Sequence, residues 1–551
     1  MECELPFASL MNLIPSARRR FLASRWALVV LALESTVFVL PAQEGDGAAP
    51  PAASTPTAVR ADAPQQRGSR RARRRTRRVR RPATPPLRHT TPKGAPALAS
   101  DLGSMLSARV RNGRWGVMVV SLTKGDTLYS VNPDLPLSPA SNMKLFTAAL
   151  ALDQFGPDHQ FSTDVLRDGE LAPDGTLQGN LILRGDGDPA LSSRFLQGGP
   201  AAPVELLAQL VASKGIRRVA GDLIADASAF DQRRIPDGWQ RRYLHNGYAA
   251  RVSALSLNEN LLWIVVRPGA GSRQPAEVVL DPATELRLSN KVQTRAGSRA
   301  ARVIVRTLED GTIEVRGWIG TRAGTRRYQI VVEDPAMFTA GAFRRALEAQ
   351  GITVAGQVRL DVTPDVASEV ASLPSPPLAR LLSVMNRESV NHYAELLFRN
   401  AARSSNGGPG TVESANALLQ RFMTEKVGAP PGSVFAADGS GLSVLDRVTP
   451  SALIKLLDYA HRAPWSDVFH TSLPVAGESE LLRHRMRLTP AQGNLHAKTG
   501  TTNTVISLGG YVTAESGEVL AFAFIYNGSD LSKAKETIDA MGATLASWVR
   551  D

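Results

Sequence analysis

The chain has 551 residues, of which 43% are hydrophobic, so it can bury a sizeable core in about three domains and is not a wholly disordered protein. Its formal net charge of +13 comes largely from one segment: Arg67 to Arg88 holds 11 arginines and no acid, and removing these 11 from +13 leaves +2. The rest of the chain is near neutral, which argues against a nucleic-acid-binding surface on the folded part. The single cysteine, Cys3, excludes an internal disulfide framework and a cysteine-based zinc site.

Residues 1–43 have the pattern of an export signal. A positive flank ends at Arg25, and the apolar run Trp26–Ala42 follows it, interrupted by Glu34. A basic region before a short apolar core is typical of a signal peptide, or of a signal anchor where cleavage does not occur; a buried helix is the alternative. The sequence thus predicts an exported, periplasmic protein, either released or anchored by this segment.

Residues 44–97 are rich in Pro, Ala, Thr and Arg and poor in large apolar side chains, so we expect a disordered linker. The arginine cluster Arg67–Arg88 has two interpretations. It contacts an anionic surface, such as phospholipid headgroups or acidic cell-wall polymer, or it is a solvated spacer that repels itself and stays extended. We expect no nucleic-acid partner, because the protein is exported and its globular part is near neutral.

From Leu98 onward we expect the chain to be globular, and the predicted secondary structure changes in kind twice along it. Residues 98–160 predict a hairpin and then a helix, residues 161–373 hold many short strand-like runs with few helices, and residues 374–551 return to helices, strands and a closing helix. The expected elements are a hairpin at 115–131, helices at 141–155, 203–215, 376–402, 410–427 and 533–550, and strands at 496–512 and 518–526. A strand pair followed by a terminal helix is typical of an antiparallel sheet covered by helices.

Two positions fit a Ser-x-x-Lys spacing, and their contexts separate them. Ser141 opens a predicted helix, so Lys144 lies one turn further on the same side and its amine can reach the hydroxyl. Ser121 and Lys124 lie where a strand runs into a turn, so their side chains need not converge. A lysine can activate a serine nucleophile if burial or a nearby cation lowers its pKa, and the helix N-terminus favours an oxyanion at the Ser141 amide. By itself, the spacing equally fits a plain N-cap serine.

Ser389-Val390-Asn391 lies within a helical, polar–apolar stretch. In a helix–helix turn that lines a cleft, the Ser389 hydroxyl could relay a proton to a leaving amine and the Asn391 amide could hold a substrate backbone. Taken alone, the motif equally fits polar surface residues.

Lys498-Thr499-Gly500-Thr501 begins a strand pattern. Gly500 would let a substrate backbone approach the strand edge closely, and Lys498 and Thr499 could bind a carboxylate. Taken alone, the motif equally fits a surface turn.

Together, the three motifs occur in the order of the Ser-x-x-Lys, Ser-x-Asn and Lys-Thr-Gly signature of penicillin-binding proteins and β-lactamases. Ser141 and Ser389 are 389 − 141 = 248 residues apart, far more than a compact β-lactamase would hold. The chain resembles the D-alanyl-D-alanine carboxypeptidase/endopeptidases, the low-molecular-mass class C penicillin-binding proteins of peptidase family S13, over roughly residues 98–551. Further matching stretches are 181–191, 221–231, 253–260, 385–395, 438–443 and 472–477.

The resemblance implies an α+β fold. Its β-lactamase/transpeptidase-like domain, an antiparallel sheet covered by helices, would comprise residues 98–160 and 374–551. It would be split by a mostly β insert at 161–373 made of one or two small domains. It implies no metal and no cofactor.

The resemblance also implies the reaction and the site. Ser141 would attack the carbonyl of the penultimate D-alanine of a peptidoglycan stem peptide, and water would then cleave the acyl-enzyme. Lys144 would be the base, Ser389 the proton relay and Asn391 a positioning residue. Lys498 and Thr499, beside Gly500, would bind the substrate carboxylate, and the amides of Ser141 and Thr501 would form the oxyanion hole. β-Lactams would acylate Ser141 as substrate mimics.

Two stretches depart from the family pattern. Glu478-Ser479-Glu480 replaces a small-residue Gly-Thr step, and Val444 stands where a basic residue is common, with Arg447 further on. The balance of carboxypeptidase and endopeptidase activity therefore stays open. Asp226 is a candidate for the acid that contacts the diamino acid in some relatives, or it is a strand-end turn residue.

Other functions fit the sequence less well. A catalytically silent cell-wall-binding protein with the same fold is one alternative, and the three intact motifs argue against it. A Ser-His-Asp hydrolase is disfavoured because no Gly-x-Ser-x-Gly elbow occurs, and a His-Glu-x-x-His zinc peptidase is excluded because that motif is absent.

Overall fold

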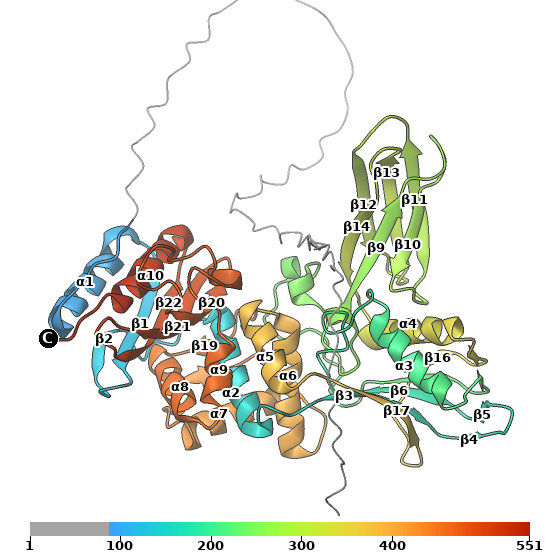
Figure 1. Cartoon of the computed structure of the whole chain (residues 1–551), viewed down its shortest axis with the longest axis horizontal. Coiled ribbons are helices and arrows are strands. Elements are labelled where there is room, and N and C mark those ends of the chain that lie inside the picture. Colours follow the sequence, from blue (N-terminus) through green and yellow to red (C-terminus); the bar gives the residue numbers. More distant parts are fainter. Residues whose placement is uncertain (1–86) are drawn as a thin grey trace, which may run out of the picture. The chain divides into compact units, whose positions relative to one another are not determined.

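The computed structural model describes residues 87–551 (Figure 1). The predicted signal or anchor at 1–43 and the linker up to residue 86, with most of the arginine cluster, lie outside the described residues. Within the described part, no helix combines the length and the apolar character needed to cross a membrane.

The folded chain starts before Leu98, so the linker prediction is wrong for residues 87–97. Helix α1 begins at Gly94. Upstream, the Thr90 N–H donates a 3.0 Å bond to Thr544 Oγ1, and Lys93 pairs with Val549. The Pro, Ala and Gly content of this segment is that of a linker. Backbone bonds to the far end of the chain order it, however, and composition does not report such bonds.

One antiparallel sheet joins the first and last parts of the chain. Its order is β2-β1-β22-β21-β20, and β1 pairs along its whole length with β22, more than 390 residues away. The expected hairpin at 115–131 is β1 and β2. The strands are β1 Arg114–Ser121, β2 Thr127–Val131, β20 His496–Thr501, β21 Val505–Thr513 and β22 Val519–Asn527.

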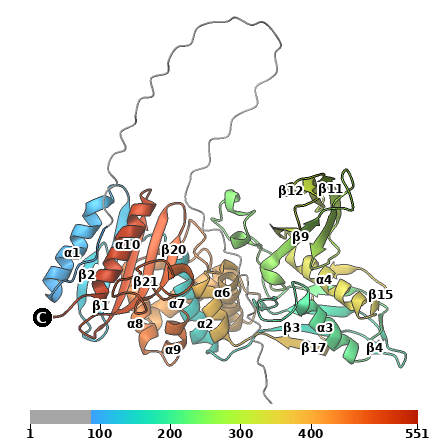
Figure 2. The same cartoon turned by 45° about the horizontal axis from the view of Figure 1, so that its top comes forward.

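Helices cover both faces of this sheet, with α1 and α10 on one face and α2 and α8 on the other (Figure 2). Along β22, Phe522 and Phe524 enter the core shared with α1 and α10, whereas Ala521 and Ala523 enter a second core shared with α2 and α8. A strand buried on both faces is apolar without alternation. The helices here are α1 Gly94–Arg109, α2 Met143–Phe155, α5 Leu378–Arg387, α6 Asn391–Asn406, α7 Val412–Glu425, α8 Pro450–Arg462, α9 Ser466–Thr471 and α10 Leu531–Ala546.

The segment between α2 and α5 forms further sheets. One has the order β16-β8-β6-β3-β17 and another β15-β7-β5-β4, and α3 and α4 pack in the same core. The elements are β3 Ser162–Arg167, β4 Glu170–Leu171, β5 Thr176–Gln178, β6 Leu181–Gly185, α3 Ala202–Ser213, β7 Arg218–Val219, β8 Leu223–Asp226, α4 Pro335–Ala349, β15 Thr353–Val354, β16 Val358–Leu360 and β17 Ser368–Pro374.

Two three-stranded sheets follow β8 in the chain, with the orders β10-β9-β14 and β11-β13-β12 (Figure 1). Their inward side chains extend the core around α3 and α4. The strands are β9 Leu261–Arg267, β10 Glu277–Asp281, β11 Leu288–Arg295, β12 Ala301–Thr307, β13 Ile313–Gly320 and β14 Arg326–Val331. A two-stranded sheet, β18 Val434–Phe435 with β19 Arg447–Val448, completes the later part of the chain.

Candidate active site

Ser141 lies in a 3-10 turn, Ala140–Asn142, that leads directly into α2. The turn places Ser141 and Lys144 on one side, one helical turn apart, as the spacing predicts. Ala140 has a φ of 46°, which a residue with a Cβ adopts only when its surroundings hold it there. The backbone before the serine is therefore set by tertiary contacts and not by local preference.

Lys144 is fully buried, and its amine has three neighbours. The Nζ atom lies 3.0 Å from Ser141 Oγ, 2.6 Å from Asn391 Oδ1 and 2.7 Å from the Ser440 carbonyl oxygen. Burial lowers the pKa of Lys144 to about 8, although three buried carboxyl groups nearby oppose the shift. At neutral pH the amine is thus far closer to its neutral, proton-accepting form than an exposed lysine would be.

Ser389 and Asn391 lie where the expected single helix at 376–402 divides into α5 and α6. Ser389 has a φ of 59°, and this left-handed residue ends one helix so that the next can begin at Asn391. The Asn391 amide is oriented by its partners: Oδ1 accepts from Lys144, and Nδ2 donates a 2.8 Å bond to the Tyr248 carbonyl. Tyr248 belongs to the segment predicted as the insert, so that segment helps to position Asn391.

Lys498 lies on β20 and is fully buried. Its Nζ donates to Ser389 Oγ at 2.9 Å and to the Thr499 carbonyl at 3.1 Å. Burial, together with the charge of Lys144, holds the pKa of Lys498 well below its usual range. A Cβ on Gly500 would lie 2.1 Å from Ser507 Oγ, so only glycine lets β20 run this close to its neighbours.

A loop of residues 437–443 closes the site from another side. The buried Asp438 carboxylate accepts from the N–H groups of Ser440, Gly441 and Ser443 and from Trp239 Nε1 at 2.7 Å. At Gly441, with a φ of +83°, a Cβ would lie only 1.8 Å from the Ala140 carbonyl oxygen. The loop thus packs directly against the backbone that carries Ser141.

These residues share one cleft of about 340 Å³. Ser141, Ser389, Asn391 and Thr501 line it, while the amines of Lys144 and Lys498 lie buried behind Ser141 and Ser389. The structure therefore brings together the residues of all three motifs.

Residues 98–548 match the D-Ala-D-Ala carboxypeptidase 3 (S13) family. The chain belongs to this family. It is similar to the D-alanyl-D-alanine carboxypeptidase of Actinomadura sp. (strain R39), 35% identical over 483 residues, or 85% of this chain and 87% of that protein. The D-alanyl-D-alanine carboxypeptidase DacB of Haemophilus influenzae is 27% identical over 75% of this chain and 85% of its own length.

A solved structure shows the same fold. The crystal structure of penicillin binding protein 4 (dacB) from Haemophilus influenzae matches with a TM-score of 0.68 at 24% identity, covering 80% of this chain and 98% of that chain. The predicted S13 resemblance, the α+β transpeptidase-like fold class and the class of serine D-Ala-D-Ala carboxypeptidase are confirmed.

Sequence reasoning missed several residues of this S13 site. Tyr243 and Tyr248 form one wall of the cleft, with ring centroids 5.9 Å apart, and Gly441 and Leu442 form another. The stretch Asp438–Ser443 matches the family, which was a signal for the second wall. No sequence motif identifies the two tyrosines as site residues, because only the tertiary fold brings them into the cleft with Ser141.

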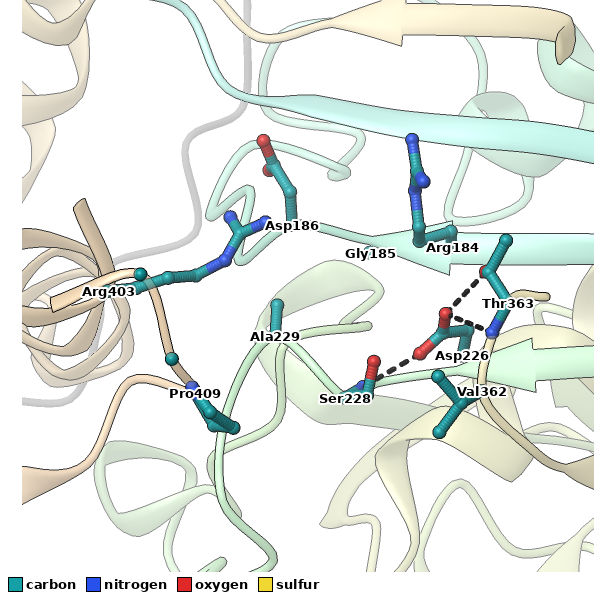
Figure 3. A pocket seen from close by; sticks show the side chains of 12 residues that line it. Arg184, Gly185, Asp186, Asp226, Ser228, Ala229, Val362, Thr363, Arg403 and Pro409 are labelled. Atoms are coloured by element: carbon teal, nitrogen blue, oxygen red, sulfur yellow. Dashed lines mark hydrogen bonds between the residues drawn. The ribbon is translucent and has the colours of Figure 1, made fainter. Parts of the chain in front are cut away.

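Asp226 is not brought to the cleft. It ends β8 and lines a different pocket, with Arg184, Asp186 and Arg403 (Figure 3). Its carboxylate accepts bonds from Ser228 and Thr363. Burial opposes the charged form, but these bonds hold the pKa of Asp226 below its usual range. Its contacts are those of the strand-end turn residue that was the alternative interpretation.

Ser121 also has a structural environment in place of a catalytic one. It lies at the end of β1, and its hydroxyl donates a 2.6 Å bond to Glu518 Oε2. It accepts a bond from the Lys124 backbone N–H, so the relation between these two residues is a turn contact. Context at the helix N-terminus therefore separates Ser141 from the second Ser-x-x-Lys match.

Proposed function

We propose that this enzyme cleaves the D-Ala-D-Ala end of peptidoglycan stem peptides through an acyl-enzyme on Ser141. The observation that carries the proposal is the 3.0 Å contact between Ser141 Oγ and the buried Nζ of Lys144 at the floor of the cleft. Paired with a lysine of lowered pKa, a serine hydroxyl has the base that acyl transfer needs.

In the first step, neutral Lys144 takes the hydroxyl proton while Ser141 Oγ attacks the carbonyl carbon of the penultimate D-alanine. The resulting ammonium finds acceptors in place, at 2.6 Å on Asn391 and 2.7 Å on Ser440. We assign the oxyanion to the backbone N–H groups of Ser141 and Thr501, where preorganised donors meet the developing charge.

In the second step, the terminal residue leaves as an amine and needs a proton. The Ser389 hydroxyl can supply this proton. Lys498, whose Nζ lies 2.9 Å from Ser389 Oγ, can then reprotonate Ser389. Lys498 and Thr499 also take the substrate carboxylate. That anion raises the pKa of the buried Lys498, so binding of the substrate and charging of this amine occur together. Water then attacks the acyl carbonyl; its proton passes through Ser389 to Lys498, and Ser141 Oγ leaves with the proton held by Lys144, so both lysines return to their starting states.

The substrate class rests on the family and on the named relatives, which are D-Ala-D-Ala carboxypeptidases. We expect β-lactams to acylate Ser141. The structure of the Haemophilus influenzae protein complexed with a novel β-lactam, TM-score 0.63, supports this expectation. Action on the cell wall requires export, so we place the protein in the periplasm. Cleavage of a D-alanine cross-link would use the same steps with a larger leaving amine.

Labelling with a fluorescent penicillin tests the nucleophile. Ser141→Ala should abolish covalent labelling and keep the thermal unfolding transition, whereas the matched Ser121→Ala should label as the parent does. Labelling that survives in Ser141→Ala would show that another serine reacts. A parent protein that stays unlabelled while a known relative reacts would favour the catalytically silent, wall-binding alternative.

Mass spectrometry of muropeptides tests the substrate. Uncross-linked pentapeptides should lose one alanine, and any endopeptidase activity would split cross-linked dimers into monomers. Neither product should form with Ser141→Ala.

A further inference from the structure

The outer face of the sheet β11-β13-β12 carries an unusual set of side chains. Arg302, Ile304 and Arg306 are exposed at alternate positions of β12, while Val303 and Val305 between them pack against the core. The register places Arg302 opposite Trp318 and Ile304 opposite Arg316 on β13. Because strand side chains alternate between faces, these residues share the solvent side of the sheet.

Strand β11 adds more positive charge to the same face. Its pairing with β13 places Lys291 opposite Arg316 and Arg295 opposite Gly320. We call the five residues Lys291, Arg295, Arg302, Arg306 and Arg316 the cationic face. One acid, Glu314, lies among them, opposite Arg306, and it forms an ion pair with Lys291.

Within residues 87–551, neither Arg302 nor Arg316 has an ion-pair partner. Arg295 stacks on the Trp318 ring, with its guanidinium carbon 4.6 Å from the centroid. Arg316 and Lys291 are also direct cross-strand neighbours. Glu314 offsets the charge of Lys291, whereas Arg302 and Arg316 keep charges that no acid of the described residues balances, so the face retains a net positive charge that an anionic partner would compensate.

The charged side chains come from all three strands of the sheet. Charges on three adjacent strands spread in two dimensions, whereas a linear polyanion is usually tracked by a charged groove. Ile304, midway along the edge strand β12 between Arg302 and Arg306, is 42% exposed, and Leu308, just past the end of that strand, is 40% exposed. Cations interleaved with an indole ring and aliphatic side chains suit the boundary between phosphate headgroups and acyl chains.

We propose that the cationic face docks on the surface of an anionic phospholipid bilayer, with the arginines on headgroup phosphates and Ile304 against the acyl boundary. This contact is independent of the proposed chemistry, because none of its residues lines the cleft at Ser141. It would hold the enzyme at the membrane through its folded part.

Vesicle co-sedimentation of the full chain tests the proposal. The variant combines Arg302→Gln, Arg306→Gln and Arg316→Gln. The matched control combines Arg380→Gln, Arg421→Gln and Arg487→Gln, three exposed arginines elsewhere, and loses the same charge. Each arginine near an anionic surface contributes roughly fivefold to partitioning, so the face variant should bind phosphatidylglycerol-containing vesicles about 100-fold more weakly than the control.

The N-terminal segments before residue 87 are the same in all three proteins, so a difference in binding between the face variant and the control reports the cationic face. This difference should shrink with added salt and disappear on vesicles of phosphatidylcholine alone. Equal binding by the face variant and the control would overturn the proposal. So would a face variant that loses retention on insoluble peptidoglycan but partitions normally onto vesicles, because the partner would then be wall polymer. Penicillin labelling of Ser141 should be equal in all three proteins, which separates this test from that of the catalytic mechanism.

Discussion

The rate at which penicillin acylates Ser141 should depend steeply on pH below about pH 8. The acylating form needs Lys144 as a neutral amine, and burial lowers the pKa of Lys144 from 10.5 to about 8. At about pH 6 only roughly 1% of an amine with that pKa is neutral, and at about pH 8 roughly half is. The second-order rate constant should therefore rise about 50-fold over this interval and level off above it.

Stopped-flow fluorescence with a labelled penicillin measures this constant before deacylation interferes. Burial also raises the pKa of Glu395 to about 8, so this neighbour titrates over the same range. The variant Glu395→Gln removes that titration, and the pH profile should still show the inflection of Lys144. The inflection should not move to higher pH, because a Glu395 carboxylate raises the pKa of Lys144 and its removal can only lower that pKa. Lys144→Arg keeps a charge that cannot act as a base, and it should cost about 10² to 10⁴ in rate and lose the inflection.

Two outcomes would refute this reasoning. A rate that is flat between about pH 6 and pH 8 would mean that Lys144 does not accept the proton. A rate that keeps rising tenfold per unit towards about pH 10 would mean that the amine is an ordinary solvated lysine, and that the burial seen here does not persist in solution.

Two further changes test the supports of the site. Gly441→Ala should reduce penicillin labelling at least tenfold, because its Cβ would meet the Ala140 carbonyl oxygen at 1.8 Å and displace the backbone before Ser141. Gly432→Ala has the same left-handed strain in open space, so it should cost about 1–2 kcal/mol in urea unfolding and leave labelling unchanged; equal labelling by both variants would contradict the clash. Asp226→Asn should lower the free energy of unfolding by about 1–3 kcal/mol through lost acceptors, with no change in acylation rate. A changed acylation rate with an unchanged free energy of unfolding would instead support the hypothesis that Asp226 contacts the substrate.

The local chemistry of the site is readable from the sequence because it depends on spacing along single elements. A helix that begins near Ser141 places Lys144 beside it whatever the rest of the chain does, and the strand at Lys498 follows from its own pattern. The division of the helical segment at Ser389 is harder to predict. Residues 376–402 have helical periodicity throughout, and the left-handed turn that separates α5 from α6 has no strong local signal.

Chain-wide packing decided the rest, since its partners are hundreds of residues apart. The lowered pKa of Lys144 comes from burial by three segments that meet only in the fold, and the orientation of Asn391 depends on a carbonyl of Tyr248. Residues 87–97 have the composition of a linker, yet bonds to the C-terminal residues hold them. Asp226, a plausible substrate contact on sequence grounds, lies in another pocket because β8 ends there. Sequence determined which groups can react, and tertiary structure decided which of them meet and in what charge state, because desolvation and long-range contact are properties of the folded chain.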